Sequence, residues 1–165
     1  MIVNELDELL ERLSTFQKRR FCVAMSGHRN VLPSAVEAVK QGTWEALECL
    51  RSKSYVLCVA TMMVEEFSVR TLEKLGIRDM FLSVRGTNFK TAISKRELIE
   101  KCLADAGATV EEAVMIGDSL DDLDAAESIG MDFVAASYGY GLPKELCEER
   151  GITYVEEPIG LCDVL

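Results

Sequence analysis

The sequence predicts an α/β protein: a doubly wound, Rossmann-like parallel sheet with helices on both faces. Short apolar runs alternate with segments in which apolar residues recur at helical spacing. Most of the apolar runs are uninterrupted, as expected of strands that are buried on both faces, and this favours a parallel sheet. Because ligands of such sheets bind beyond the carboxyl ends of the strands, the loops that follow the strands are the candidate site.

The amino-terminal region predicts an amphipathic helix followed by a strand. Apolar residues recur at helical spacing across residues 5–17, so we assign the helix to the segment 1–18. Phe21–Met25 is apolar throughout and predicts a buried strand. Pro33 suits the first turn of a second helix, which we expect to end near Arg51.

The rest of the chain repeats this alternation, with turn and cap residues at the expected boundaries. The segment SKRE, Ser94–Glu97, is a capping box, and Gly76, Gly107 and Gly130 stand where helices end. The predicted strands are Tyr55–Ala60, Met80–Val84, Ala113–Ile116, Phe133–Ala136 and Thr153–Val155. The predicted helices cover residues 64–75, 94–106, 120–129 and 143–150.

Composition limits the partners and the setting. A chain of 165 residues with 48% hydrophobic content is expected to form one domain, residues 1–165. A formal net charge of −10 disfavours nucleic acid as a partner, and no apolar run approaches the length that spans a membrane. The six cysteines are scattered without a CxxC pair, which indicates reduced thiols and a soluble, cytoplasmic protein.

The loop IGDSLDD, residues 116–122, is the most specific polar segment. Asp118 at the strand end and Asp122 at the start of the next helix are spaced so that both could address a divalent cation of the Mg²⁺ type. A simpler interpretation is that Asp118, Ser119 and Asp121 only cap the helix and complement its dipole.

Residues 54–142 resemble the catalytic core of the haloacid dehalogenase superfamily, and most closely its phosphoglycolate-phosphatase-like branch. The similar segments are VATMM at 59–63, SKRELIEKCLADAG at 94–107 and EEAVMIGDSLDDLDAAESIGM at 111–131. The resemblance implies that Thr61 binds a phosphoryl oxygen, that Lys95 neutralises nucleophile and phosphate, and that the two aspartates, Asp118 and Asp122, hold Mg²⁺. These roles suit phosphoryl transfer, which depends on positioning and charge neutralisation. Taken singly, Thr61 could instead be a helix N-cap and Lys95 a solvated surface lysine.

The family's first motif, DxDGT, carries the nucleophile and the general acid/base, and here it is degenerate. In the segment FCVAMSGHRN, anchoring on Gly27 aligns Ala24 with the first Asp, Ser26 with the second and His28 with the Thr. No shift of this alignment restores the nucleophile, because no Asp occurs between Asp7 and Asp79.

Alanine has no atom that can attack phosphorus or bind a metal, so a phosphoaspartate intermediate is excluded at this position. Ser26 is a poor base without an activating partner, and His28 lacks an evident orienting acid. The segments 30–54 and 76–94 are too short for the cap domain that the family often inserts, so we expect a capless core.

Three functions are compatible with this sequence. The first is a pseudoenzyme or very weak phosphatase that retains the binding of a small phosphorylated molecule, with at most weak Mg²⁺ binding. The second is an active Mg²⁺-dependent phosphoric monoester hydrolase with altered chemistry at Ser26 or His28. The third is an assembly protein with a vestigial pocket, whose open cleft is covered by a protein partner or by a second subunit.

Overall fold

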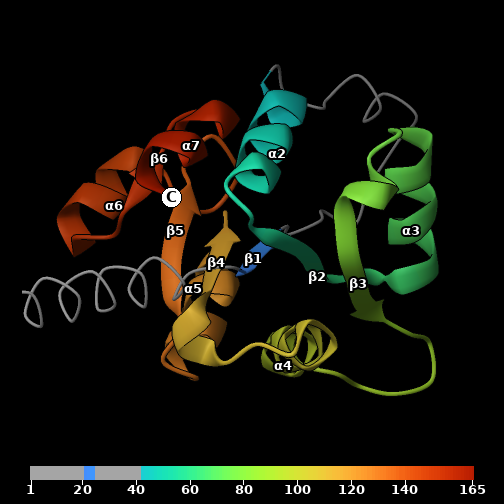
Figure 1. Ribbon diagram of the computed structural model, residues 1–165. Helices are drawn as coiled ribbons and strands as arrows, with labels where there is room; N and C mark the ends of the chain where they lie inside the picture. The colour runs from blue at the N-terminus through green and yellow to red at the C-terminus, as the bar shows by residue number, and fades with distance from the viewer. Residues whose placement is uncertain (1–20, 25–41) are drawn as a thin grey trace, which may run out of the picture.

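The computed structural model describes residues 21–24 and 42–165, and these form one parallel sheet flanked by helices (Figure 1). The strands are β1 (Phe21–Ala24), β2 (Val56–Val64), β3 (Phe81–Thr87), β4 (Ala113–Gly117), β5 (Asp132–Ala136) and β6 (Tyr154–Val155). Their order is β3-β2-β1-β4-β5-β6, so the chain runs outward from β1 to one edge and then returns to build the other half. The doubly wound fold that the sequence predicts is confirmed.

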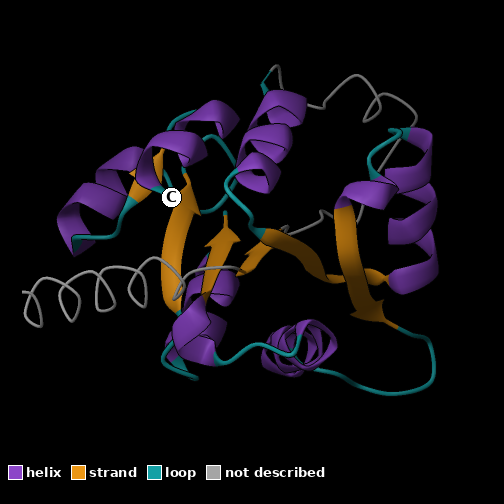
Figure 2. Ribbon diagram, viewed as in Figure 1, coloured by secondary structure: helices purple, strands orange, loops and turns teal. Residues whose placement is uncertain are grey.

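Helices connect successive strands, as parallel pairing requires (Figure 2). The α-helices are α2 (Thr43–Ser52), α3 (Glu65–Lys74), α4 (Lys95–Ala106), α5 (Leu120–Glu127), α6 (Lys144–Arg150) and α7 (Leu161–Val164). Short 3₁₀ turns lie at η2 (Arg78–Met80), η3 (Val110–Glu112) and η4 (Pro158–Gly160). Within the described part of the chain, none of these helices is long and apolar enough to cross a membrane.

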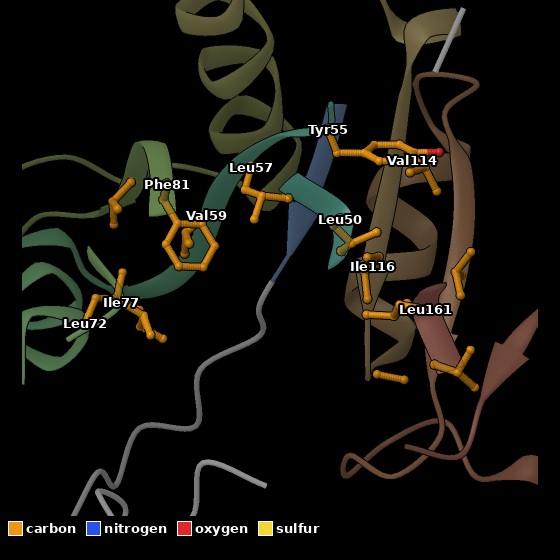
Figure 3. Close-up of a cluster of buried hydrophobic side chains, with 14 residues drawn as sticks. Leu50, Tyr55, Leu57, Val59, Leu72, Ile77, Phe81, Val114, Ile116 and Leu161 are labelled. Atoms are coloured by element: carbon orange, nitrogen blue, oxygen red, sulfur yellow. The ribbon is translucent and has the colours of Figure 1, made fainter. Parts of the chain in front are cut away.

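The sheet is buried on both faces because successive side chains of its central strands enter different cores. On β2, Leu57 and Val59 pack with Leu50 of α2 and Leu161 of α7 in one cluster (Figure 3). The alternate residues of the same strand, Cys58 and Ala60, pack against α4 and α5 on the other face. This alternation explains why the sequence of the strand is apolar without interruption.

Several elements differ in extent from their predictions. The described part of the second helix begins after Gly42, whose φ of 91° is left-handed and therefore cannot continue a helix. Its predicted start at Pro33 and the predicted helix at 5–17 lie outside the described residues. Strands β2 and β3 both extend past their predicted ends, because they pair with each other as far as Val64 and Thr87.

One disulfide corrects the expectation of reduced thiols throughout. Cys49 on α2 and Cys162 on α7 are joined across 113 residues of sequence, with their Cα atoms 6.3 Å apart. Both are partly exposed, whereas Cys58, Cys102 and Cys147 are buried free thiols. The sequence missed the pair because only the packing of α7 on α2 brings the two residues together.

Candidate functional site at the carboxyl ends of the central strands

The candidate residues meet where the strand order reverses. β1 lies between β2 and β4, and its last residue, Ala24, pairs with Ile116, two residues before Asp118. Thr61 lies on the neighbouring β2, past the last residue of that strand that pairs with β1. The carboxyl ends of the three central strands therefore bring Ala24, Thr61 and Asp118 to one edge, where doubly wound sheets bind their ligands.

Lys95 reaches this edge from the first turn of α4. Ser94 is the N-cap of that helix, and its capping box with Glu97 is complete, so the start of the helix is fixed. Only 8% of the Lys95 side chain is exposed, which contradicts the solvated-lysine alternative. Its Nζ donates to the carbonyl oxygen of Ala60 over 2.7 Å, so the ammonium lies beside the end of β2.

Asp122 is the ion-pair partner of this lysine. Its Oδ1 lies 2.8 Å from Lys95 Nζ, and only 1% of the Asp122 side chain is exposed. With the acids of the first motif absent, the sequence predicts Asp118 as the main counter-ion of Lys95, and this prediction is wrong because the structure shows Asp122 in that role. A cation at the start of a helix is unfavourable because the helix dipole is positive there, and the Asp122 carboxylate offsets this.

The second oxygen of Asp122 is also hydrogen bonded. Ser119 donates its hydroxyl to Oδ2 over 2.8 Å, and the Asp118 amide donates to the same oxygen over 3.3 Å. Ser119 in turn caps α5 by accepting from the Asp122 amide. The helix-capping interpretation of this loop is thus correct for Ser119, and Asp122 binds in the same network. A Cβ at position 117 would lie 2.8 Å from Asp122 Oδ2, so Gly117 leaves the room that the buried carboxylate needs.

Asp118 is held by the loop that follows β5. The Tyr140 amide donates to Asp118 Oδ2 over 3.1 Å, and the Gly141 amide donates to the Asp118 carbonyl over 2.8 Å. A Cβ at position 139 would lie 2.7 Å from Asp118 Cγ, so Gly139 is required for this close approach. The segment SYGYG at 137–141 thus adds a contact with Asp118 to the site.

Thr61 is buried in β2, three residues before the strand ends at Val64, and is not a helix cap. Its Oγ1 accepts from the Met63 amide over 3.1 Å, and the N-cap of α3 is Val64, which rules out the capping alternative. A threonine hydroxyl that accepts one bond keeps its own proton for donation to an oxyanion. Ser26 and His28, the other two candidates of the first motif, lie outside the described residues.

The described side chains do not by themselves make up a site for Mg²⁺, the cation that the fold family generally uses. Mg²⁺ prefers octahedral oxygen coordination that includes one or two carboxylates. Both oxygens of Asp122 are engaged by Lys95, Ser119 and a backbone amide, and one oxygen of Asp118 accepts from Tyr140. Within residues 21–24 and 42–165, no group of three or more His, Cys, Asp or Glu side chains is placed to hold a metal ion.

Ionisable groups farther along α4 serve packing. Arg85 of β3 donates two hydrogen bonds to Asp105, and with a further bond from Ser83 these hold the pKa of Asp105 below its ordinary value. The pKa of the Cys102 thiol is raised by its hydrogen bond with Cys58 and by burial. A thiol with a raised pKa is a poor nucleophile, so Cys102 behaves as part of the core.

Comparison with known sequences agrees with this geometry. A family model described as haloacid dehalogenase-like hydrolase matches residues 5–136. The chain is 30% identical over 150 residues to a phosphoglycolate phosphatase of Chromobacterium violaceum, covering 90% of this chain and 64% of the relative. It is 32% identical over 108 residues to the tyrosine-protein kinase PtkA of Mycobacterium bovis, covering 65% of this chain and 37% of the relative. A phosphoglycolate phosphatase of Agrobacterium fabrum is 27% identical over 82% of the chain, which spans 54% of that relative.

Solved structures share the same architecture. A HAD phosphatase from Thermococcus onnurineus superposes with a TM-score of 0.62 at 25% identity, over 76% of this chain and 57% of that one. A HAD-superfamily hydrolase of subfamily IA from Geobacter sulfurreducens gives a TM-score of 0.61 at 26% identity, over 76% and 55% of the two chains. The chain thus spans between about a third and two-thirds of the length of these relatives. The family model matches residues 5–136, and the strand order and the cluster of site residues are consistent with that match. This chain belongs to the haloacid dehalogenase-like hydrolase family.

Proposed function

We propose that this protein is a pseudoenzyme, or at most a very weak phosphatase, that binds a small phosphorylated molecule at the carboxyl ends of its central strands. One observation carries the proposal: Ala24 ends β1, which lies between β2, the strand that carries Thr61, and β4, the strand that Asp118 follows. The residue at the end of this central strand is thus one that cannot attack phosphorus. Removing a catalytic nucleophile lowers turnover by up to about a million-fold, while binding and electrostatic contributions survive.

Two of the described groups support retained binding. The Thr61 hydroxyl is buried in β2 with its proton available for donation. The Lys95 ammonium is held by the carbonyl of Ala60, the residue before Thr61, so the cation is positioned before any ligand arrives. Fixed donors that need no rearrangement are favourable for binding an oxyanion.

A second candidate function is an assembly protein whose open site is covered by a partner chain or by a second copy. Exposed aromatic residues support it. Phe89, in the loop after β3, is 84% exposed, and Tyr140, whose amide contacts Asp118, is 80% exposed. Exposed aromatic side chains are typical of surfaces that bind a partner. We also propose a cytoplasmic location: the buried thiols Cys58, Cys102 and Cys147 support it, and the Cys49–Cys162 disulfide counts against it.

Restoring the first motif tests the proposal. Phosphate release from a panel of phosphorylated metabolites is measured with Mg²⁺ for the wild type, Ala24→Asp, Ser26→Asp and the double variant. The double variant returns a nucleophile, an acid/base group and carboxylate ligands together, so it alone should gain activity, because residues that act as a unit are strongly non-additive. Circular dichroism and thermal unfolding check that each variant is folded, since two new carboxylates near Asp118 are destabilising.

The wild type decides between the pseudoenzyme and the active hydrolase. Turnover that matches the double variant, and that is lost in Lys95→Ala, would overturn the proposal in favour of an enzyme with altered chemistry at Ser26 or His28. A folded double variant that stays inactive on every substrate would mean that the loss of chemistry extends beyond the first motif. Binding of a phosphorylated metabolite to the wild type, measured by calorimetry, is the positive result that the proposal requires.

A further inference from the structure

The ion pair and hydrogen bonds of Asp122 indicate which ligands this site can bind. A carboxylate that binds a metal must present an oxygen lone pair to it. Asp122 instead directs Oδ1 at Lys95 Nζ and Oδ2 at the Ser119 hydroxyl and the Asp118 amide, and its side chain is 99% buried. A Mg²⁺ ion bound to Oδ1 would lie next to the Lys95 ammonium, which is 2.8 Å from the same oxygen. Two like charges at such a distance repel strongly in a buried site.

The sequence around β1 supplies no replacement carboxylate. No Asp or Glu occurs between Glu11 and Glu37, a stretch that includes β1 and the whole segment up to the predicted second helix. The protein thus lacks the two negative charges of DxD, and it also lacks the need for a divalent cation to offset them before a phosphate can approach.

We infer that this edge of the sheet binds an oxyanion such as phosphate without a divalent cation, with the Lys95 ammonium as the resident positive charge and Asp122 as its buried counter-ion. The inference rests on the proposed function and adds a property that the relatives' metal chemistry does not supply. Here the network of Lys95, Asp122 and Ser119 is complete without a metal. The Thr61 hydroxyl and the Lys95 ammonium are the two described groups that would contact the anion.

Isothermal titration calorimetry with inorganic phosphate tests the inference. The wild type is titrated in excess EDTA and again in millimolar MgCl₂, and the two dissociation constants are expected to agree within about twofold. A tightening of about tenfold or more in Mg²⁺ would overturn the inference while leaving the proposed phosphate binding intact. Absence of binding in both buffers would instead overturn the proposed function.

Thermal unfolding with Mg²⁺ alone decides the metal question independently of phosphate. The melting temperature of the wild type should not change with MgCl₂, whereas Lys95→Met, which leaves Asp122 without its ammonium, should be stabilised by the metal. Lys101→Met is the matched control, because Lys101 is an exposed residue of the same helix, and it should behave as the wild type does. A rise in the wild-type melting temperature with Mg²⁺, matched in Lys101→Met, would overturn the inference whether or not phosphate binds.

Discussion

Removal of the Lys95 ammonium should destabilise the fold far more than the loss of an ordinary salt bridge. Lys95→Met keeps the length of the side chain and removes the charge, leaving the Asp122 carboxylate buried with two hydrogen bonds and no counter-ion. Side-chain exposures of 8% and 1% mean that water cannot screen the change. Breaking such a pair by removing one partner lowers the free energy of unfolding by about 3–5 kcal/mol.

A double-mutant cycle isolates the pair from the packing around it. Asp122→Asn alone leaves the ammonium with the Ala60 carbonyl, and Lys95→Met with Asp122→Asn removes both charges together. The double variant should therefore lose less stability than the sum of the two single variants, by about 1–3 kcal/mol. The assay is urea unfolding followed by circular dichroism, with midpoints compared at a common m-value.

The neighbouring residue offers a control on the same helix. Arg96 pairs with Glu100 at 2.9 Å, with the two side chains 53% and 45% exposed, so Arg96→Met should lower the free energy of unfolding by at most about 0.5 kcal/mol. If Lys95→Met also lost less than about 1 kcal/mol, the buried pair would be no stronger than this surface pair. The argument that Asp122 is committed to Lys95 would then fail.

Two further predictions concern stability away from the site. Cys162→Ser removes the disulfide to Cys49 and should lower the free energy of unfolding by about 2–4 kcal/mol relative to the wild type in non-reducing buffer. In excess dithiothreitol the variant and the wild type should have nearly the same free energy of unfolding. Equal losses in both buffers would mean that packing, and not the cross-link, is responsible. The Arg85–Asp105 pair should contribute stability that is fully present above the ordinary carboxyl pKa of 3.8. This stability should be lost as the pH falls through the lowered pKa of Asp105 in the folded state. The urea midpoint of the wild type should therefore fall more steeply below about pH 4 than the midpoint of Asp105→Asn. Parallel pH profiles would contradict that assignment.

The features that sequence reasoning predicted well depend on local chemistry. The capping box at Ser94 lies within four consecutive residues, and the αL glycine Gly107 ends the same helix as expected. The uninterrupted apolar strands follow from burial on both faces, and this pattern alone is enough to indicate a parallel sheet. The edge at which Thr61 and Asp118 meet followed from the fold class, because parallel strands end at one side of a sheet.

The features that sequence reasoning missed depend on contacts between distant segments of the chain. Burial of Lys95 requires α4, β2 and the start of α5 to be packed together, so base rates for lysine gave the wrong expectation. The same holds for the disulfide, whose partners are 113 residues apart, and for α7, which at four residues is too short to show a helical period. The extension of β2 to Val64 is likewise set by its pairing with β3, which no local pattern in β2 reveals.

The residues that carry the family resemblance therefore differ in what their presence means. Lys95 and Asp122 form a buried ion pair, and Ser119 caps a helix, so all three have structural roles that remain whether or not the protein turns over a substrate. A pseudoenzyme that lost any one of them would lose stability as well, and for that reason their retention is weak evidence of catalysis. Ala24 carries the opposite information, because an alanine side chain has no atom that can attack phosphorus. Our proposal that catalysis is lost therefore rests on that one position, and the rest of the motif set reports mainly on the integrity of the fold.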